Sequence, residues 1–244
     1  MIKARIQAAN PDANLKSYTE TYKRFNWEEV AKEFTWYQTG KVNIIHEAID
    51  RWAQDPKKQN QIAIIFEKGT ESINYTYSDL REKSCQWANF LSKYGFYTGD
   101  RLFIFAPSCP EAYLAMLGAC RLGIIFCHLF SSTSFDELAL RLANAKPRGI
   151  LTHPDLVERI PPEVKESVRH IFLTEGPSPG LFPDEIVIEG LPDQMPKTRD
   201  PIWLDLTAPL YMNYTSGSTG PPKGIVHAHK DMSGILISAR YVLD

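Results

Sequence analysis

The sequence lacks the features that mark membrane, secreted and nucleic-acid-binding proteins. No apolar run approaches the ~18 residues that a membrane helix requires, and residues 1–7 lack the continuous apolar core of a secretory signal. The net charge is −2 and the sequence pI is about 6.3, so no basic field for nucleic acid is present. We therefore expect a cytoplasmic chain with no membrane span and no nucleic-acid partner.

Cysteine is scarce, and its placement excludes two common uses. The four cysteines are Cys85, Cys109, Cys120 and Cys127. They form no C-x-x-C pair, so we expect reduced core thiols and neither a disulfide framework nor a zinc site. His227 and His229 are two positions apart, and such positions do not face each other on a helix. We therefore predict no metal site from this pair.

The length and the apolar content allow a sizeable core. The 244 residues suffice for one large domain or two small ones at about 100–200 residues each, and 43% of them are hydrophobic. We expect three parts, at 1–60, 61–175 and 176–244. Residues 1–60 are rich in aromatic and charged side chains without strand alternation. This pattern predicts a helical arm, with one helix starting at 26–29 and another at 44–52.

Residues 61–175 contain apolar runs that alternate with helical patterns. The expected strands are 62–66, 73–76, 101–105, 123–127, 149–151 and 168–173, the first two forming a hairpin. Expected helices occupy 110–122 and 134–145, and another is capped by Ser78 and Asp79 and ends near Gly95. Strands that alternate with helices favour an α/β fold with a largely parallel sheet flanked by helices.

Residues 176–244 begin with prolines and lead to a loop of unusual composition. Seven prolines between 177 and 209 prevent long helices there. A strand at 209–214 then starts a second strand group. The following residues, 214–224, hold four serine or threonine hydroxyls, three glycines and one lysine, and a further apolar strand starts at Ile225.

This composition suits a polyphosphate ligand. Glycines let backbone N–H groups converge on anionic oxygens, because they tolerate positive φ and carry no Cβ. Hydroxyls add donors and the lysine adds a mobile charge. The loop is neither a Walker A motif, because Lys223 precedes Gly224, nor G-x-G-x-x-G. A flexible glycine-serine turn without a ligand is the alternative, which the two prolines before the lysine disfavour.

The stretch T-S-G-S-T-G-P-P-K-G at 215–224 resembles the signature loop of the adenylate-forming enzymes, which include acyl-CoA synthetases, peptide-synthetase adenylation domains and luciferases. Stretches that also resemble the family, in order, are 75–80 (L-T-Y-x-E-L), 98–102 (G-D-x-V) and 111–123, the helix before a core strand. The stretches 36–43 and 50–51 are similar to W-F-x-G-G-x-L-N…D-R-H, which opens acetyl-CoA synthetase-type members. The resemblance to AMP-forming acyl-CoA synthetases spans about residues 27–230.

The resemblance implies the N-terminal portion of an enzyme that joins a carboxylic acid to the α-phosphate of ATP, releases pyrophosphate and passes the acyl group to coenzyme A. ATP, Mg²⁺ and coenzyme A are the implied cofactors. The loop would hold the β- and γ-phosphates. The implied phosphate-binding residues are Thr215, Ser216, Gly217, Ser218, Thr219, Gly220, Lys223 and Gly224. His229 is the implied candidate for a substrate-side role.

Parts of the family pattern do not occur after the loop. The Y-G-x-T-E motif, the ribose-binding aspartate and the catalytic lysine are expected beyond Asp244, so the chain alone is expected to be inactive and to need a C-terminal half as partner. Acetate, longer fatty acids and aromatic acids all stay open as substrates. The alternatives are a non-catalytic nucleotide-binding or interaction protein derived from such an enzyme, and an adenylation domain that loads a carrier protein.

One departure concerns coenzyme A. Acetyl-CoA synthetases carry an Arg-Gly-Gly segment near the strand at 149–151, whereas T-H-P-D-L-V-E-R stands here at 152–159. We interpret Arg159 as a solvated arginine rather than a substitute, so the residues that contact coenzyme A stay open. Cys127 and His128 are interpreted as core residues.

Overall fold

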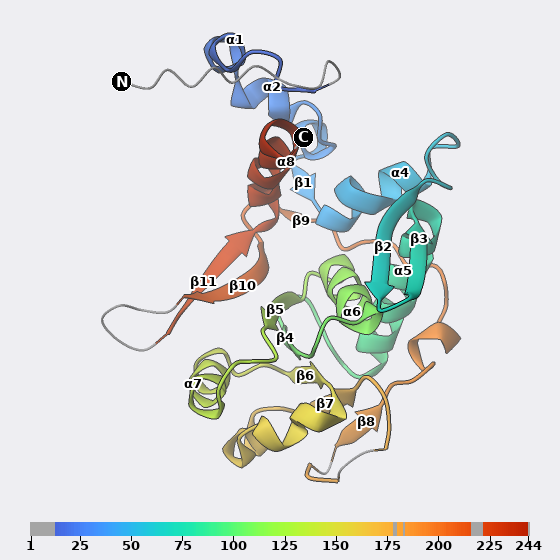
Figure 1. Cartoon of the computed structure of the whole chain (residues 1–244), viewed down its shortest axis with the longest axis vertical. Coiled ribbons are helices and arrows are strands. Elements are labelled where there is room, and N and C mark those ends of the chain that lie inside the picture. The colour runs from blue at the N-terminus through green and yellow to red at the C-terminus, as the bar shows by residue number, and fades with distance from the viewer. Residues whose placement is uncertain (1–12, 178–179, 183, 216–221, 244) are drawn as a thin grey trace.

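The computed structural model describes residues 13–177, 180–182, 184–215 and 222–243. A seven-stranded sheet runs through it in the order β11-β10-β5-β4-β6-β7-β8 (Figure 1). Its strands are β4 (Arg101–Phe105), β5 (Ile125–Leu129), β6 (Gly149–Thr152), β7 (His170–Leu173), β8 (Glu185–Val187), β10 (Pro209–Thr215) and β11 (Lys223–Ala228). Neighbours pair in parallel, except β10 and β11, which pair antiparallel. The expected α/β fold with a largely parallel sheet is confirmed.

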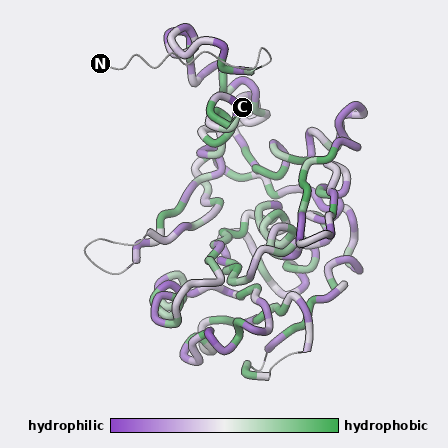
Figure 2. Tube along the Cα trace, in the orientation of Figure 1, coloured by the Kyte–Doolittle hydropathy of each residue, from purple (hydrophilic) through white to green (hydrophobic). Residues whose placement is uncertain are grey.

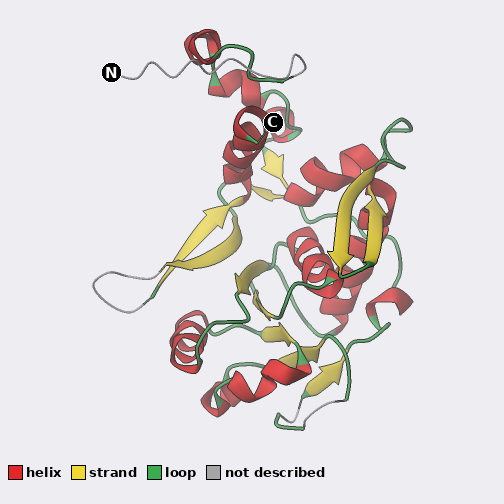
Figure 3. Ribbon diagram, in the orientation of Figure 1, coloured by secondary structure: helices red, strands yellow, loops and turns green. Residues whose placement is uncertain are grey.

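Helices cover both faces of the sheet, because the central strands alternate their side chains between two cores. On β4, Leu102 and Ile104 belong to one core, and Phe103 and Phe105 belong to the other. Helices α5 and α6 contribute to the first core and α7 to the second (Figure 3). The helices are α5 (Tyr77–Lys93), α6 (Pro110–Arg121) and α7 (Phe135–Ala145), with 3₁₀ turns η2 (Pro154–Arg159) and η3 (Pro162–Glu166).

Short strands form two smaller antiparallel sheets beside the main one. The hairpin of β2 and β3 agrees with the prediction, and β1 pairs with β9, which lies in the proline-rich segment. The bounds are β1 (Lys41–Val42), β2 (Ile62–Lys68), β3 (Glu71–Thr76) and β9 (Leu204–Asp205). The hydropathy trace shows mostly apolar residues in the inner strands of the main sheet and polar ones at the β2–β3 turn (Figure 2).

The N-terminal segment consists of short helices that pack against the last helix (Figure 1). The helices of this segment are α1 (Tyr18–Arg24), α2 (Trp27–Ala31), α3 (Trp36–Thr39), the π-helix η1 (His46–Asp50) and α4 (Arg51–Ala53). The last helix is α8 (Met232–Val242), and two further 3₁₀ turns lie later in the chain, η4 (Pro192–Gln194) and η5 (His229–Asp231). Ile237 of α8 packs on the cluster around Phe34, and Arg240 pairs with Glu33 at 2.6 Å. The two ends of the described chain thus lie side by side. The three-part division of the chain stays a prediction.

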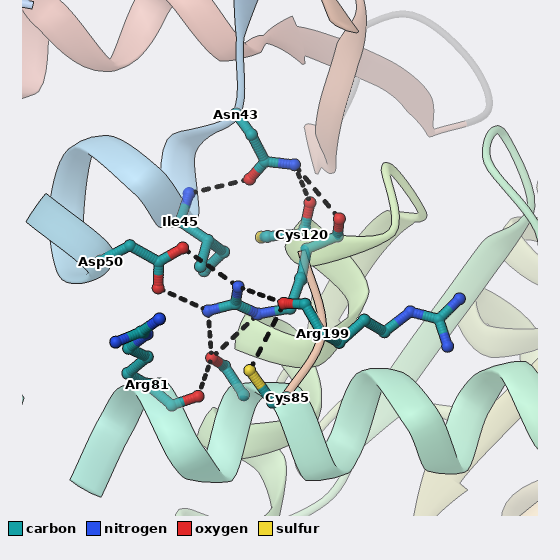
Figure 4. A network of polar contacts seen from close by, with 9 residues as sticks. Asn43, Ile45, Asp50, Arg81, Cys85, Cys120 and Arg199 are labelled. Atoms are coloured by element: carbon teal, nitrogen blue, oxygen red, sulfur yellow. Dashed lines mark hydrogen bonds and ion pairs between the residues drawn. The ribbon is translucent and has the colours of Figure 1, made fainter. Parts of the chain in front are cut away.

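A buried polar network joins the N-terminal segment to the sheet helices (Figure 4). The guanidinium of Arg121 donates to both carboxylate oxygens of Asp50, at 2.7 and 3.0 Å, and to the Ser84 hydroxyl and the Arg199 carbonyl. The Asn43 amide donates to two carbonyls at the end of α6. Asn43 and Asp50 lie in the stretches that resemble the opening of acetyl-CoA synthetases, and here they connect separate segments.

Two local predictions need correction. Thr76, not Ser78, is the N-cap of α5, whereas Asp79 takes part in the cap as predicted: the Thr76 hydroxyl accepts from the Asp79 amide at 3.1 Å, and the Asp79 carboxylate accepts from the Thr76 amide at 2.9 Å. Strand β5 begins at Ile125 rather than at position 123, because Gly123 lies in a turn with φ of 67°.

The four cysteines and the lengths of the helices relate to the predictions of reduced core thiols and of no membrane span. All four cysteines are free thiols, and burial raises the pKa of Cys120 and Cys127 to about 12, which keeps both protonated. Within the described ranges, no helix has both the length and the apolar character needed to cross a membrane.

Candidate active site at the carboxyl edge of the sheet

The candidate loop leaves the sheet at the carboxyl end of β10. Strand β10 runs parallel to β5, with Tyr211 opposite Phe126, and β5 runs parallel to β4. The loop therefore starts at the edge where β4 and β5 also end, which is where open α/β sheets bind ligands. The candidate residues Ser216, Gly217, Ser218, Thr219 and Gly220 lie outside the described residues.

The base of the loop is a hairpin. Thr215 on β10 lies opposite Lys223 on β11, and both are exposed. The next pair is Tyr214 with Gly224. A Cβ atom on Gly224 would lie 3.0 Å from the Met212 sulfur and 3.3 Å from the Tyr214 ring. A side chain at this position would therefore have to displace the Met212 thioether or the Tyr214 ring.

Tyr214 ties this hairpin to α7. Its hydroxyl lies 2.7 Å from Asn144 Oδ1 and 3.2 Å from the Arg141 carbonyl oxygen. The Arg141 guanidinium lies 5.7 Å from the centre of the tyrosine ring. Burial raises the pKa of Tyr214 to about 12, so the hydroxyl stays a hydrogen-bond donor near neutral pH. The position at which the loop starts is thereby fixed against a helix.

The neighbouring loop after β5 is held by two arginines. Arg159 donates to the carbonyls of Ser131 and Thr133, and its guanidinium lies 5.5 Å from the centre of the Phe105 ring. Arg141 donates to the Thr133 hydroxyl at 3.4 Å. The interpretation of Arg159 as a solvated arginine is therefore wrong: its charge supports a loop at the carboxyl edge.

A cavity of about 410 Å³ lies at the carboxyl ends of β4 and β5. Ser108, Tyr113, His128 and Phe130 are among its lining residues. His128 is exposed, so its interpretation as a core residue is wrong. The pleat of β5 is the reason, because successive side chains point to opposite faces and Cys127 occupies the buried one.

The two histidines after the loop have separate environments. His227 lies on β11, not on a helix, and stacks on Tyr211 with 4.5 Å between ring centres. His229 is fully buried: its Nδ1 accepts from the Ile44 amide at 3.1 Å, and Nε2 has no partner. Burial lowers the pKa of His229 to about 4, so the ring is neutral. A substrate-side role for His229 stays a prediction.

Sequence reasoning found the loop but missed its supports. Arg141 and Arg159 carry no local signal, because their contacts join residues that are distant in sequence. An aromatic residue directly before a polar loop was the one available sign, and it applied to Tyr214.

Comparison with known proteins places this chain in a family. The model of the AMP-binding enzyme family matches residues 50–242. An acetyl-coenzyme A synthetase of Bacillus subtilis is 37% identical over 240 residues, which are 98% of this chain and 42% of that protein. An acetyl-coenzyme A synthetase of Dictyostelium discoideum is 30% identical over 284 residues, and the match covers 95% of this chain and 41% of that protein.

Solved structures share the fold. A Brucella canis acyl-CoA synthetase aligns with a TM-score of 0.80 and 20% identity, covering 91% of this chain and 40% of that one. An anthranilate CoA ligase in complex with anthranoyl-AMP aligns with a TM-score of 0.68 and 22% identity, covering 82% and 36%. The chain spans about two fifths of the length of the curated relatives named above. Because the family model covers most of the chain, the chain belongs to the family of AMP-binding enzymes.

Proposed function

We propose that the chain is the part of an AMP-forming acid–thiol ligase that binds the phosphate groups of ATP. In this reaction a carboxylate oxygen attacks the α-phosphorus, the bond from that phosphorus to its bridging oxygen breaks, and pyrophosphate leaves. The thiol of coenzyme A then attacks the acyl carbon, AMP leaves, and the thiol proton passes to solvent. The observation that carries the proposal is the hairpin base, where Thr215 lies opposite Lys223 at the carboxyl edge.

The role we propose for the loop is to hold the β- and γ-phosphates. Thr215 offers a hydroxyl donor and Lys223 a positive charge, and both are exposed at the point where the loop begins and ends. Ser216, Ser218 and Thr219 add hydroxyls and Gly217 and Gly220 add backbone donors in this proposal. A fixed polyphosphate presents the α-phosphorus in line with the attacking oxygen, which lowers the entropic part of the barrier.

Magnesium enters the proposal as part of the substrate MgATP. The described part of the chain holds no group of three or more His, Cys, Asp or Glu side chains that could bind a metal. We therefore assign no magnesium ligand among these residues. Mg²⁺ in such sites is commonly bound through substrate phosphates and few protein groups.

We propose a short-chain acid, acetate first, as the acyl donor and coenzyme A as the acceptor. The support is that the two relatives named above, at 37% and 30% identity, are acetyl-coenzyme A synthetases. The anthranilate ligase shares the fold only, so it does not favour an aromatic acid here.

We also propose that these 244 residues alone form no acyl-adenylate. The support is that more than half of the length of each relative lies outside the match. In this proposal, the residues that bind adenine and ribose and those that catalyse the reaction belong to the part of the enzyme that corresponds to the unmatched length of the relatives.

The test compares Lys223→Ala with Lys68→Ala, which removes the same charge from the exposed β2 strand. Binding of MgATP is measured by equilibrium dialysis, and acetate-dependent exchange of pyrophosphate into ATP is measured after co-expression with the part of the Bacillus subtilis relative that the match leaves out. Loss of a charge-assisted contact of about 1.5–3 kcal/mol predicts at least tenfold weaker MgATP binding for Lys223→Ala, with Lys68→Ala unchanged. Equal binding by both variants would remove Lys223 from this role.

The two rival functions give different results in the same assays. A non-catalytic nucleotide-binding protein binds MgATP through Lys223 but shows no exchange with any acid after co-expression. An adenylation domain that loads a carrier protein shows exchange but no thioester with coenzyme A.

A further inference from the structure

A cavity of about 580 Å³ lies at the amino edge of the main sheet, on the opposite side from the candidate active site. The parallel strands β6 and β7 start at this edge. Among the described residues that line the cavity, the charged ones are Lys93, Arg148, Arg169 and Asp184. Three positive charges thus face one negative charge, which leaves a surplus of two positive charges. Open α/β sheets usually bind ligands at the other edge, so a ligand of this cavity must be recognised by these side chains.

Two of the cations lie side by side on neighbouring strands. The register pairs Gly149 with His170, and directly before this pair the Arg169 amide donates to the Arg148 carbonyl oxygen at 2.8 Å. Side chains at equivalent positions of parallel strands lie on the same face of a sheet, and both arginines line the cavity. Two neighbouring guanidinium groups repel each other, and an anion that contacts both removes this repulsion.

Arg148 is held in place by its surroundings. Its guanidinium lies 5.7 Å from the centre of the Phe96 ring and 5.8 Å from that of Tyr97, and its Nε lies 3.6 Å from Asp100 Oδ2. A Cβ atom on Gly95 would lie 3.0 Å from a terminal nitrogen of Arg148, so glycine leaves room for the guanidinium. A side chain that is already fixed loses little further freedom when it binds an anion.

The other two cations have no charged partner. Lys93 and Arg169 are exposed, and neither forms an ion pair within the described ranges. Lys93 lies in the last turn of α5, where the helix dipole favours a positive charge. Arg169 precedes a strand and has no such local reason. Its charge is therefore available to a ligand.

His170, the first residue of β7, also lines the cavity. Its Nδ1 is buried and has no hydrogen-bond partner among the described residues. Burial lowers the pKa of His170, and the charges of Arg148 and Arg169 act in the same direction. The positive field of the two arginines thus reaches the ring, and an anion in the cavity would offset it.

We infer that this cavity binds the phosphate group of a small phosphate monoester. The planar guanidinium groups of Arg148 and Arg169 match pairs of phosphate oxygens, and Lys93 adds a third positive charge. A phosphate dianion equals the surplus charge of the described lining. The cavity is larger than one phosphate group, and Tyr94 and Val168 line it as well, so apolar surface is available to the organic part of the ester.

The experiment titrates the whole 244-residue chain with phenyl phosphate by isothermal titration calorimetry. Low ionic strength and pH 7.5 keep the phosphate dianionic and the charges unscreened. We expect saturable binding to wild type, and at least tenfold weaker binding to Arg169→Gln, which removes one exposed charge. The matched control is Arg81→Gln, because Arg81 is an exposed arginine of α5 outside the cavity, and this variant should bind as wild type does.

The NMR signals of the His170 ring locate the bound ester. They are assigned with His170→Gln and should shift when phenyl phosphate is added, whereas those of His227 on β11 should not. Inorganic phosphate should bind at least several-fold more weakly than phenyl phosphate, because it makes no contact with the apolar surface. Lys223→Ala should change neither the binding nor the shifts, because Lys223 does not line this cavity.

Four results would overturn the inference. They are no binding of phenyl phosphate, binding that Arg169→Gln weakens no more than Arg81→Gln, loss of binding in Lys223→Ala, and inorganic phosphate that binds as tightly as the ester. Because MgATP is absent from these titrations, failure of MgATP to bind at Lys223 leaves their result intact, and the two proposals fail independently.

Discussion

At the scale of single residues, His229 shows how burial decides a protonation state. Its Nδ1 accepts the Ile44 amide proton at 3.1 Å, so the neutral ring carries its own proton on Nε2. That nitrogen is buried without a partner, and burial lowers the pKa of His229 to about 4. Burial alone disfavours the imidazolium, because a charge loses its hydration there.

This environment predicts a loss of stability as the pH falls. The ordinary pKa of histidine is about 6.5, so above this pH the His229 ring is neutral in both the folded and the unfolded chain. Between pH 6.5 and about 4 only the unfolded chain binds the proton, so the folded state loses on the order of 3 kcal/mol across this window. Below that window both states are protonated, and this contribution changes no further.

Urea unfolding of wild type and His229→Gln, at pH 7.5 and pH 4.5, checks this expectation. The glutamine offers an acceptor to the Ile44 amide but does not titrate. Its loss of unfolding free energy between the two pH values should be smaller than that of wild type by about 2 kcal/mol or more. An equal loss in both proteins would show that His229 is not the group responsible.

At the scale of elements, the contact of α5 with α6 depends on Gly118. A Cβ atom at this position would lie 2.5 Å from the Trp87 Cβ and 2.8 Å from the Ala88 nitrogen. Both are close to or part of the α5 backbone, so they cannot rotate away. Gly234 on α8 has nothing within 4 Å of such an atom.

The two glycines therefore predict opposite effects of the same substitution. Gly118→Ala should lower the free energy of unfolding by at least about 1–3 kcal/mol, because the helices must separate. Gly234→Ala should raise it by up to about 1 kcal/mol, because alanine favours a helix interior. Chemical denaturation of both variants measures the difference. A stabilised Gly118→Ala protein would contradict the close packing of α5 on α6.

Elements were predictable where local patterns determine them. The buried run at β4 and the proline in the first turn of α6 predict their elements within a residue, because apolar continuity and the missing proline N–H act locally. The cap of α5 was not predictable between Thr76 and Ser78, since both are hydroxyl residues and the backbone conformation decides. The start of β5 shifted because Gly123 forms a turn.

In the candidate site, too, local features could be predicted from the sequence and tertiary contacts could not. The loop at 215–224 could be proposed as a phosphate-binding loop from composition and order alone, because such a loop has glycines and donors close together in sequence, and this role stays a proposal. The contacts of Tyr214 with α7 and of Arg159 with the loop after β5 arise from tertiary packing. Only the three-dimensional structure brings those residues together.

At the scale of the whole molecule, the Asp50–Arg121 pair connects segments that are far apart in sequence (Figure 4). The side chains of Arg121 and Asp50 are 1% and 5% exposed, and the guanidinium also reaches Ser84 on α5 and the Arg199 carbonyl. The pair therefore fixes the N-terminal segment, two helices and the proline-rich connection relative to one another. Removing one partner leaves the other charge buried without compensation.

Asp50→Ala is accordingly expected to lower the free energy of unfolding by about 3–5 kcal/mol. The control is Asp205→Ala, which removes the partner of Lys41 in an exposed pair and should change stability by less than about 1 kcal/mol. The double variant Asp50→Ala/Arg121→Met removes both charges and should recover part of the loss, because no buried ion remains unpaired. Urea denaturation of the four proteins gives these differences directly. If Asp50→Ala costs no more than Asp205→Ala, the network does not hold the N-terminal segment on the sheet.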